Sequence, residues 1–181
     1  MTRIPALIAA ACFALLAQNA LTQGVTEEAM ATLESIEPIA LSDADVKNWI
    51  AAARAFDEQK IDLDAMHGDS FPTRESMIGT MTNSAEVLAI LDRHEFTPQH
   101  FADVSLNLML AMGASEMAKH KAEVDQAMQE LESMKDQLPP GQYEQLVKQV
   151  VGAQAMFRKA PPGNVELAQK YGPELAALGG N

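Results

Sequence analysis

The sequence predicts an all-α protein, an irregular bundle of five or six helices. Apolar residues recur at helical spacing in several segments, and no stretch of useful length alternates apolar and polar residues as a strand does. Capping residues precede these segments, and prolines or glycines follow them. We therefore expect a bundle with a buried central helix near residues 98–112 and a C-terminal helical hairpin.

The first 24 residues have the layout of a secretory signal peptide. Arg3 supplies an early positive charge, residues 4–17 form an apolar run, and small or polar residues follow. That run is shorter than the roughly 20 residues that a membrane-spanning helix needs. We expect cleavage near Gly24, with Ala20 as the alternative, and a soluble periplasmic or secreted protein that does not span a membrane.

Residues 25–181 are expected to form a single helical domain, with a loosely ordered lead-in at 25–40. Removal of the signal peptide takes away Arg3 and leaves 12 basic residues against 25 acidic ones, a net charge of −13. This charge disfavours nucleic acids and anionic lipid surfaces as partners. Cys12, the single cysteine, lies inside the signal, so the mature chain should hold no disulfide or thiolate metal site.

The lead-in contains one short candidate helix, over residues 27–36, which Pro38 would stop. The first strong helix signal covers residues 43–59. Ser42 stands at the N-cap with Asp45 three residues later, as in a capping box. The apolar side of this helix carries Val46, Trp49, Ile50, Ala53 and Phe56.

A polar loop at 61–73 should lead into helical residues 74–93. The positions expected to be buried there are Met77, Ile78, Met81, Leu88 and Leu91. Asn83, with Glu86 three residues later, has the pattern of a new helix start. The sequence leaves open whether this segment is one helix or two.

The segment that begins at Pro98 is apolar on nearly every side, which is typical of a helix buried among others. Thr97 is its expected cap, and Phe96 with Phe101 forms a hydrophobic staple. Gly113 costs about 1 kcal/mol in a helix interior relative to alanine, so we expect the helix to break or kink there. The charged segment at 115–138 should follow as a surface helix.

The C-terminal part contains two more expected helices. The short Pro-Pro-Gly connection at 139–141 makes residues 141–157 the antiparallel neighbour of the 115–138 helix. Asn164 caps a short terminal helix that ends before Gly172. These segments give the predicted hairpin and its closing helix.

Three stretches carry a family resemblance: LSDADVKNWIAA, HEFTPQHFADVSLNLMLAM and PPGNVELAQKYGPELAAL. Their order is similar to that of small, uncharacterised helical secreted proteins of proteobacteria. The resemblance covers most of the mature chain and implies export and an all-helical fold. It carries over no established activity.

Methionine and histidine side chains form the one candidate metal site. Met117 and His120 are three residues apart on one helical face, and thioether plus imidazole ligands suit Cu(I). Met77 and Met81, four apart on an earlier helix, are the expected outside ligands. The alternative is that methionine fills the core here, as it does in many proteins.

Other motifs fail on spacing. In HEFTPQH, His94 and His100 are six apart, with a cap and a proline between them, whereas the zinc-protease pattern needs two histidines four apart. DLDAMHGDSF departs from the calcium loop because its glycine comes one place late. Its Gly-Asp-Ser also resembles the nucleophile block of GDSL hydrolases, but the only Asp-x-x-His precedes Ser70 instead of following it.

These observations predict an exported binding or interaction module without enzymatic activity, because no nucleophile, base and orienting group can be assembled from the sequence. Its partner would be another protein or a small ligand, and no cofactor is indicated. The alternative function is a periplasmic copper-binding protein that uses Met117, His120, Met77 and Met81.

Overall fold

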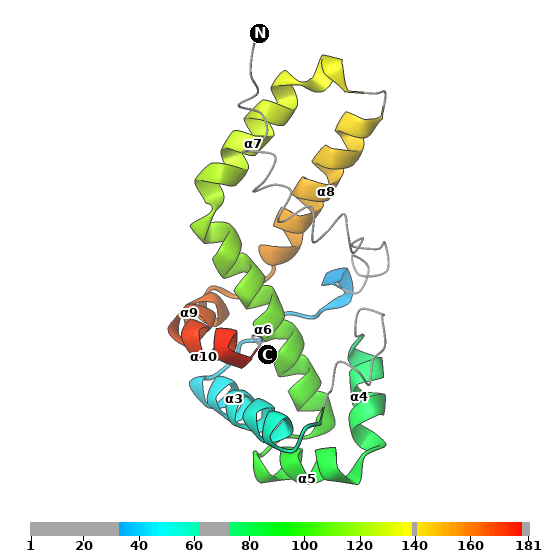
Figure 1. Ribbon diagram of the computed structural model, residues 1–181, viewed down its shortest axis with the longest axis vertical. Helices are drawn as coiled ribbons and strands as arrows, with labels where there is room; N and C mark the ends of the chain where they lie inside the picture. The colour runs from blue at the N-terminus through cyan, green and yellow to red at the C-terminus, as the bar shows by residue number, and fades with distance from the viewer. Residues whose placement is uncertain (1–32, 62–72, 139–140, 179–181) are drawn as a thin grey trace.

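The computed structural model describes residues 33–61, 73–138 and 141–178. The expected signal peptide, the start of the lead-in and the calcium-loop and hydrolase motifs at 62–72 lie outside the described residues. Within the described residues there are helices and no strands, which confirms the all-α class. The helices are more numerous than the five or six expected. In chain order, and with the labels of Figure 1, they are α3 (Asp43–Glu58), α4 (Arg74–Thr82), α5 (Ala85–Arg93), α6 (Pro98–Lys119), α7 (Lys121–Ser133), the 3-10 helix η1 (Lys135–Gln137), α8 (Gln142–Phe157), α9 (Pro162–Lys170) and α10 (Gly172–Leu178).

Helix α6 is the centre of the molecule, as the sequence predicts. The helices α3, α4, α5, α8 and α9 all pack against it. Its buried positions lie on several sides of the helix, because it has neighbours on several sides. They are Phe101, Ala102, Val104, Leu106, Asn107, Leu108, Leu110, Ala111 and Ser115.

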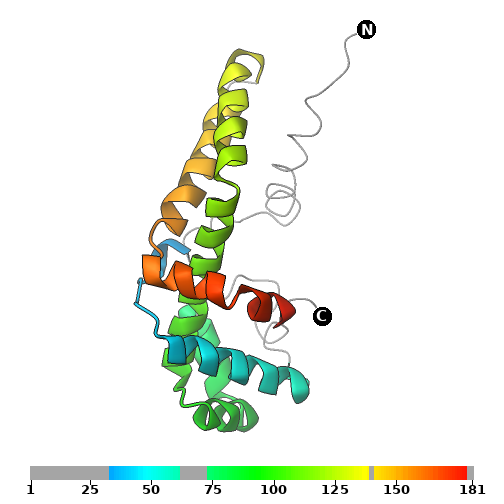
Figure 2. The same cartoon turned by 90° about the vertical axis from the view of Figure 1, so that its left-hand side faces the viewer.

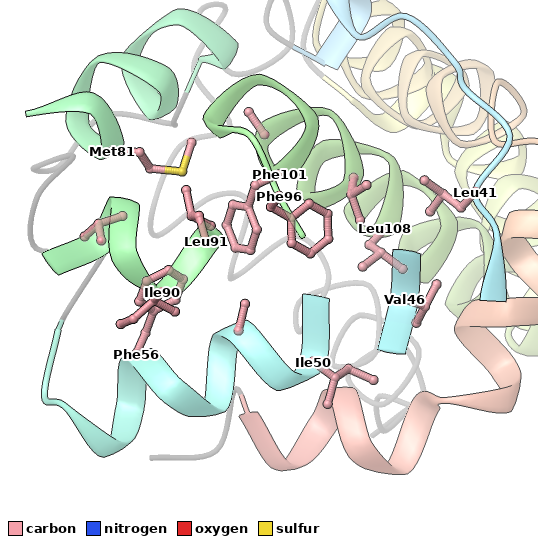
Figure 3. Close-up of a cluster of buried hydrophobic side chains, with 14 of the residues drawn as sticks. Leu41, Val46, Ile50, Phe56, Met81, Ile90, Leu91, Phe96, Phe101 and Leu108 are labelled. Atoms are coloured by element: carbon pink, nitrogen blue, oxygen red, sulfur yellow. The ribbon is translucent and has the colours of Figure 1, made fainter. Parts of the chain in front are cut away.

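Aromatic rings hold the start of α6 against its neighbours (Figure 3). The Phe101 ring meets Phe56 and Phe96 edge to face, with centroid distances of 5.8 and 5.3 Å. Trp49 stacks on Phe101 at 6.1 Å, and its indole N–H donates to the Ser105 hydroxyl at 2.7 Å. Such pairs add about 0.5–1.5 kcal/mol each beyond the area that they bury.

The helix starts follow the expected capping chemistry in most places. Ser42 and Asp45 form the capping box of α3, and the Thr97 hydroxyl accepts from the His100 N–H at the start of α6. The segment at 74–93 is two helices. Its second start is capped by Ser84, which accepts from the Val87 N–H, whereas Asn83 ends the first helix.

Gly113 does not break α6, contrary to expectation. The helix continues to Lys119, and the break falls at His120. A Cβ atom built on Gly113 would lie 2.0 Å from Cε1 of Phe157, on α8. Close packing between α6 and α8 therefore accounts for this glycine. The sequence alone predicts a helix break at the same residue.

Two buried asparagines hold the extended segment that precedes α3. The Ile39 N–H donates to Oδ1 of Asn107 at 3.0 Å, and the Leu41 N–H donates to Oδ1 of Asn164 at 2.8 Å. The side-chain amides donate in return to the carbonyls of Glu37 and Ile39. Backbone groups that no helix or strand satisfies here obtain partners from α6 and α9. Asn164, the predicted cap of the terminal helix, instead lies inside α9.

Helices α7 and α8 form the predicted C-terminal hairpin. They run antiparallel and project as an arm away from the other helices (Figures 1 and 2). The Tyr143 hydroxyl donates to Glu132 across the arm, and the Lys135 ammonium lies 5.0 Å from the centre of the Tyr143 ring. Leu131 is the buried residue of α7. Among the described side chains of the arm, Leu146, Val147 and Val150 are only half buried.

Candidate functional site

A groove lies at the base of the arm. It has a volume of about 540 Å³ and is open to solvent. Four helices contribute to it: the end of α6, the start of α7, the end of α8 and the outer side of α9. Its lining residues are Ala114, Met117, Ala118, Lys121, Val124, Asp125, Gln154, Phe157, Arg158, Ala160, Pro162, Val165, Glu166 and Gln169.

The groove exists because α8 reaches α6 at Gly113 and then turns. The Phe157 ring rests against this glycine. The chain then passes through Ala160, which is buried, into α9. Helix α9 crosses α6 below the arm (Figure 2). An apolar space remains between these helices, and no described side chain fills it.

Charged groups stand at the rim of the groove. Lys121 and Asp125 on α7 pair with each other at 2.5 Å. Arg158 on the α8 side and Glu166 on α9 make no ion pair within the part of the chain that the structure describes. The rim thus offers one charge of each sign to a bound partner.

The four predicted metal ligands lie in different surroundings. Met81 is 2% exposed and belongs to the main core cluster, between α4 and α5 (Figure 3). Met77 is half buried and packs against both core clusters. Met117 lines the groove, whereas His120 is exposed. Met77 and Met81 therefore pack in the core.

His120 is instead surrounded by carboxylates. Its Nδ1 is hydrogen-bonded to Glu123, and its Nε2 lies 3.9 Å from Oε2 of Glu116. Within the described residues, no group of three or more His, Cys, Asp or Glu side chains is arranged to hold a metal. Copper binding by methionine and histidine stays a prediction that no contact supports.

A second polar cluster joins the starts of α3 and α6. The Ser42 hydroxyl donates to Asp45 at 2.6 Å, and Nε2 of His100 lies 2.8 Å from the other Asp45 oxygen. A nucleophilic serine needs the histidine between serine and acid, whereas here the acid is in the middle. Partial burial alone would raise the Asp45 pKa, but hydrogen bonds from Ser42 and His100 outweigh it and lower the pKa. This arrangement is a helix cap supported by a histidine.

Sequence reasoning missed the groove as a site because its walls come from four separate helices. Two apolar stripes in the sequence do contribute to it. Met117 and Val124 share the apolar stripe of the 115–138 segment, and Phe157 ends the apolar side of the next helix. Neither stripe is fully covered in the structure, which is what leaves a groove.

No family model matches the chain, and neither a curated protein nor a solved structure matches it. The resemblance to small helical secreted proteins therefore stays a prediction. Among the described helices, none is long and apolar enough to cross a membrane.

Proposed function

We propose that this protein is an exported, non-enzymatic binding module that takes an apolar helical segment of a partner protein into the groove at the base of the arm. The observation that carries the proposal is the groove, with its apolar floor and charged rim. Export is inferred from the signal-like residues 1–24.

The shape of the groove favours a protein segment over a small molecule. Pockets for small ligands usually bury about 70–90% of the ligand surface. An open groove does not enclose a small ligand to that extent. An amphipathic helix needs only one face covered, and helix-in-groove binding is a common recognition mode.

The negative net charge of the chain favours a partner with basic residues. The expected mature chain carries a net charge of −13, so a partner with basic residues beside its apolar face would be attracted over long range. Glu166 at the rim provides a place for one such residue. We therefore expect an apolar face flanked by lysine or arginine.

Two synthetic amphipathic peptides of about 15 residues test the proposal. They share one apolar leucine face, and their polar faces carry lysine in one peptide and glutamate in the other. We expect the lysine peptide to bind in isothermal titration calorimetry and the glutamate peptide to bind at least about tenfold more weakly, a difference of about 1.4 kcal/mol.

A matched pair of variants locates the binding. Val124→Lys places a charge in the groove, whereas Val151→Lys adds the same charge to the arm at a side chain that is already 50% exposed and does not line the groove. Val124→Lys should weaken binding of the lysine peptide at least about tenfold, and Val151→Lys far less. Equal effects of the two variants, or no binding of either peptide, would contradict the proposal.

A further inference from the structure

Helix α8, one of the two helices of the arm, carries an exposed valine on its outer face (Figure 1). Val151 is 50% exposed, the largest exposed fraction among the large hydrophobic side chains of the described residues. At 100° per residue it lies about 120° around the helix from Phe157, whose ring packs on Gly113 of α6. Val151 therefore lies on a side of α8 that α6 does not cover, and it does not line the groove.

Two charged side chains flank Val151 at equal distances along the helix. Glu144 stands seven residues before it and Arg158 seven residues after it, so the three share one face of α8 within about 40°. Both charged side chains are exposed, and neither makes an ion pair within the described residues. Arg158 continues the helical path, because its N–H donates to the Gln154 carbonyl at 3.1 Å. This outer face therefore has a negative charge near one end, a positive charge near the other and an apolar residue at the midpoint.

The order of these charges makes the outer face of α8 complementary to itself. When two α8 helices pack antiparallel about a twofold axis at Val151, each residue meets the one that lies equally far beyond the axis. Glu144 of each copy then meets Arg158 of the other, which gives two ion pairs around a central contact of valine with valine. Val147 meets Ala155, a small residue that lets the helices approach closely. A parallel arrangement would instead set like charges beside each other.

We propose that two copies of this chain form an antiparallel homodimer through the outer face of α8, with Val151 on the twofold axis and Glu144 paired with Arg158. The 16 residues of α8 make a contact about 24 Å long and about 10 Å wide. That contact is at the low end of specific protein interfaces, so the dimer is weak and reversible. We expect a dissociation constant between about 10 µM and about 1 mM. The inference does not require that the groove bind a partner.

Charge reversal tests the pairing of Glu144 with Arg158. Sedimentation equilibrium measures dimerisation of the full chain with Cys12→Ser, at about 0.15 M salt to screen the repulsion between two acidic copies. Glu144→Lys and Arg158→Glu should each raise the dissociation constant about fivefold or more, because each replaces two attractive pairs by two repulsive ones. The double variant, which carries both changes, should return it to within about twofold of the starting value, since opposite charges face each other again.

A matched pair of lysine variants distinguishes the outer face of α8 from the groove. Val151→Lys sets two like charges against each other on the axis and should weaken dimerisation at least about tenfold. Val124→Lys, in the groove, should leave dimerisation unchanged. The expected effects on peptide binding are the reverse, so the two proposals fail separately. Far-UV circular dichroism checks that the variants are folded.

A disulfide bond tests the position of the axis. Packed helices lie about 8–10 Å apart with their Cα atoms about 2.3 Å from each axis, so two facing residues have Cα atoms about 4–5 Å apart. A disulfide spans that distance. In the chain with Cys12→Ser, Val151→Cys should therefore form a covalent dimer on mild oxidation, and Gln129→Cys, exposed on α7, should form far less.

Three results would overturn the inference. The first is a chain that stays monomeric up to about 1 mM. The second is a double charge variant that dimerises no better than the single variants. The third is a Val124→Lys variant that loses dimerisation as strongly as Val151→Lys does, because the groove would then be the contact.

Discussion

Gly113 offers the sharpest test of the packing in this structure. In α6 an alanine at this position would gain about 1 kcal/mol of helix propensity over glycine. Its Cβ, however, would lie 2.0, 2.5 and 2.6 Å from three atoms of the Phe157 ring. Carbon atoms attract each other best at about 3.5–4.0 Å, so the ring would have to move by about 1.5 Å or more.

The two effects have opposite signs, and the second should dominate. Overpacking costs about 1–3 kcal/mol, which outweighs or cancels the gain in propensity. The Phe157 ring is half buried, so it relieves part of the clash by rotating toward solvent. We expect Gly113→Ala to lower the free energy of unfolding by about 0–2 kcal/mol.

Gly79 provides the matched control. It lies inside α4, and a Cβ built there meets nothing within 4 Å. Gly79→Ala should therefore raise the free energy of unfolding by about 1 kcal/mol. The two variants should differ by about 1–3 kcal/mol when urea unfolding is followed by circular dichroism.

A double variant then identifies the clash. Leucine at position 157 is smaller than phenylalanine, so Gly113→Ala should cost less in a Phe157→Leu background than in the native one. If Gly113→Ala stabilises the protein as much as Gly79→Ala does, α8 does not approach α6 at this glycine, and the reasoning is refuted.

Three further predictions concern Asn164, Glu95 and Asp45. Asn164→Ala removes the partners of the Leu41 N–H and the Ile39 carbonyl, and should lower the free energy of unfolding in urea by about 2–4 kcal/mol. An effect below about 0.5 kcal/mol would contradict the two hydrogen bonds. Glu95→Gly should stabilise by about 0.5–1 kcal/mol in the same assay, because Glu95 has φ +62°, a conformation that glycine adopts without strain; destabilisation would show that this strain is absent. Folding lowers the Asp45 pKa from 3.8, so the contribution of Asp45 to the free energy of unfolding is complete above that pH and is lost as the pH falls through the lowered pKa. Asp45→Asn should therefore reduce the loss of stability between about pH 5 and pH 2. An unchanged dependence of stability on pH would contradict the interaction of Asp45 with Ser42 and His100.

The predictions from sequence succeeded where one segment carried the whole signal. Ser42 with Asp45, and Thr97 with Pro98, are local capping patterns, and the structure confirms both starts. Residues 98–112 are apolar on nearly every side of the helix, and this composition alone predicts a buried central helix. Local chemistry is sufficient for such features, because the interacting atoms are a few residues apart.

The predictions failed where a residue's role depends on a distant segment. The sequence predicts a helix break at Gly113, but the neighbour of this glycine is Phe157, on a helix that no local pattern connects to it. The sequence predicts a helix cap at Asn164, but the Asn164 side chain satisfies backbone groups of residues 39 and 41. Glycine and asparagine are ambiguous for this reason, since each is common both at helix ends and in close tertiary contacts.

The pair Met117 and His120 shows how helix geometry alone can place two residues together without giving them one task. Residues three apart on a helix lie near each other. The chain leaves the helical path at His120, however, so Met117 lines the groove whereas His120 is exposed between α6 and α7. Helix geometry predicts that the two residues are close, but it cannot predict that only Met117 faces the groove, because the groove walls also come from α8 and α9, which are distant in the sequence.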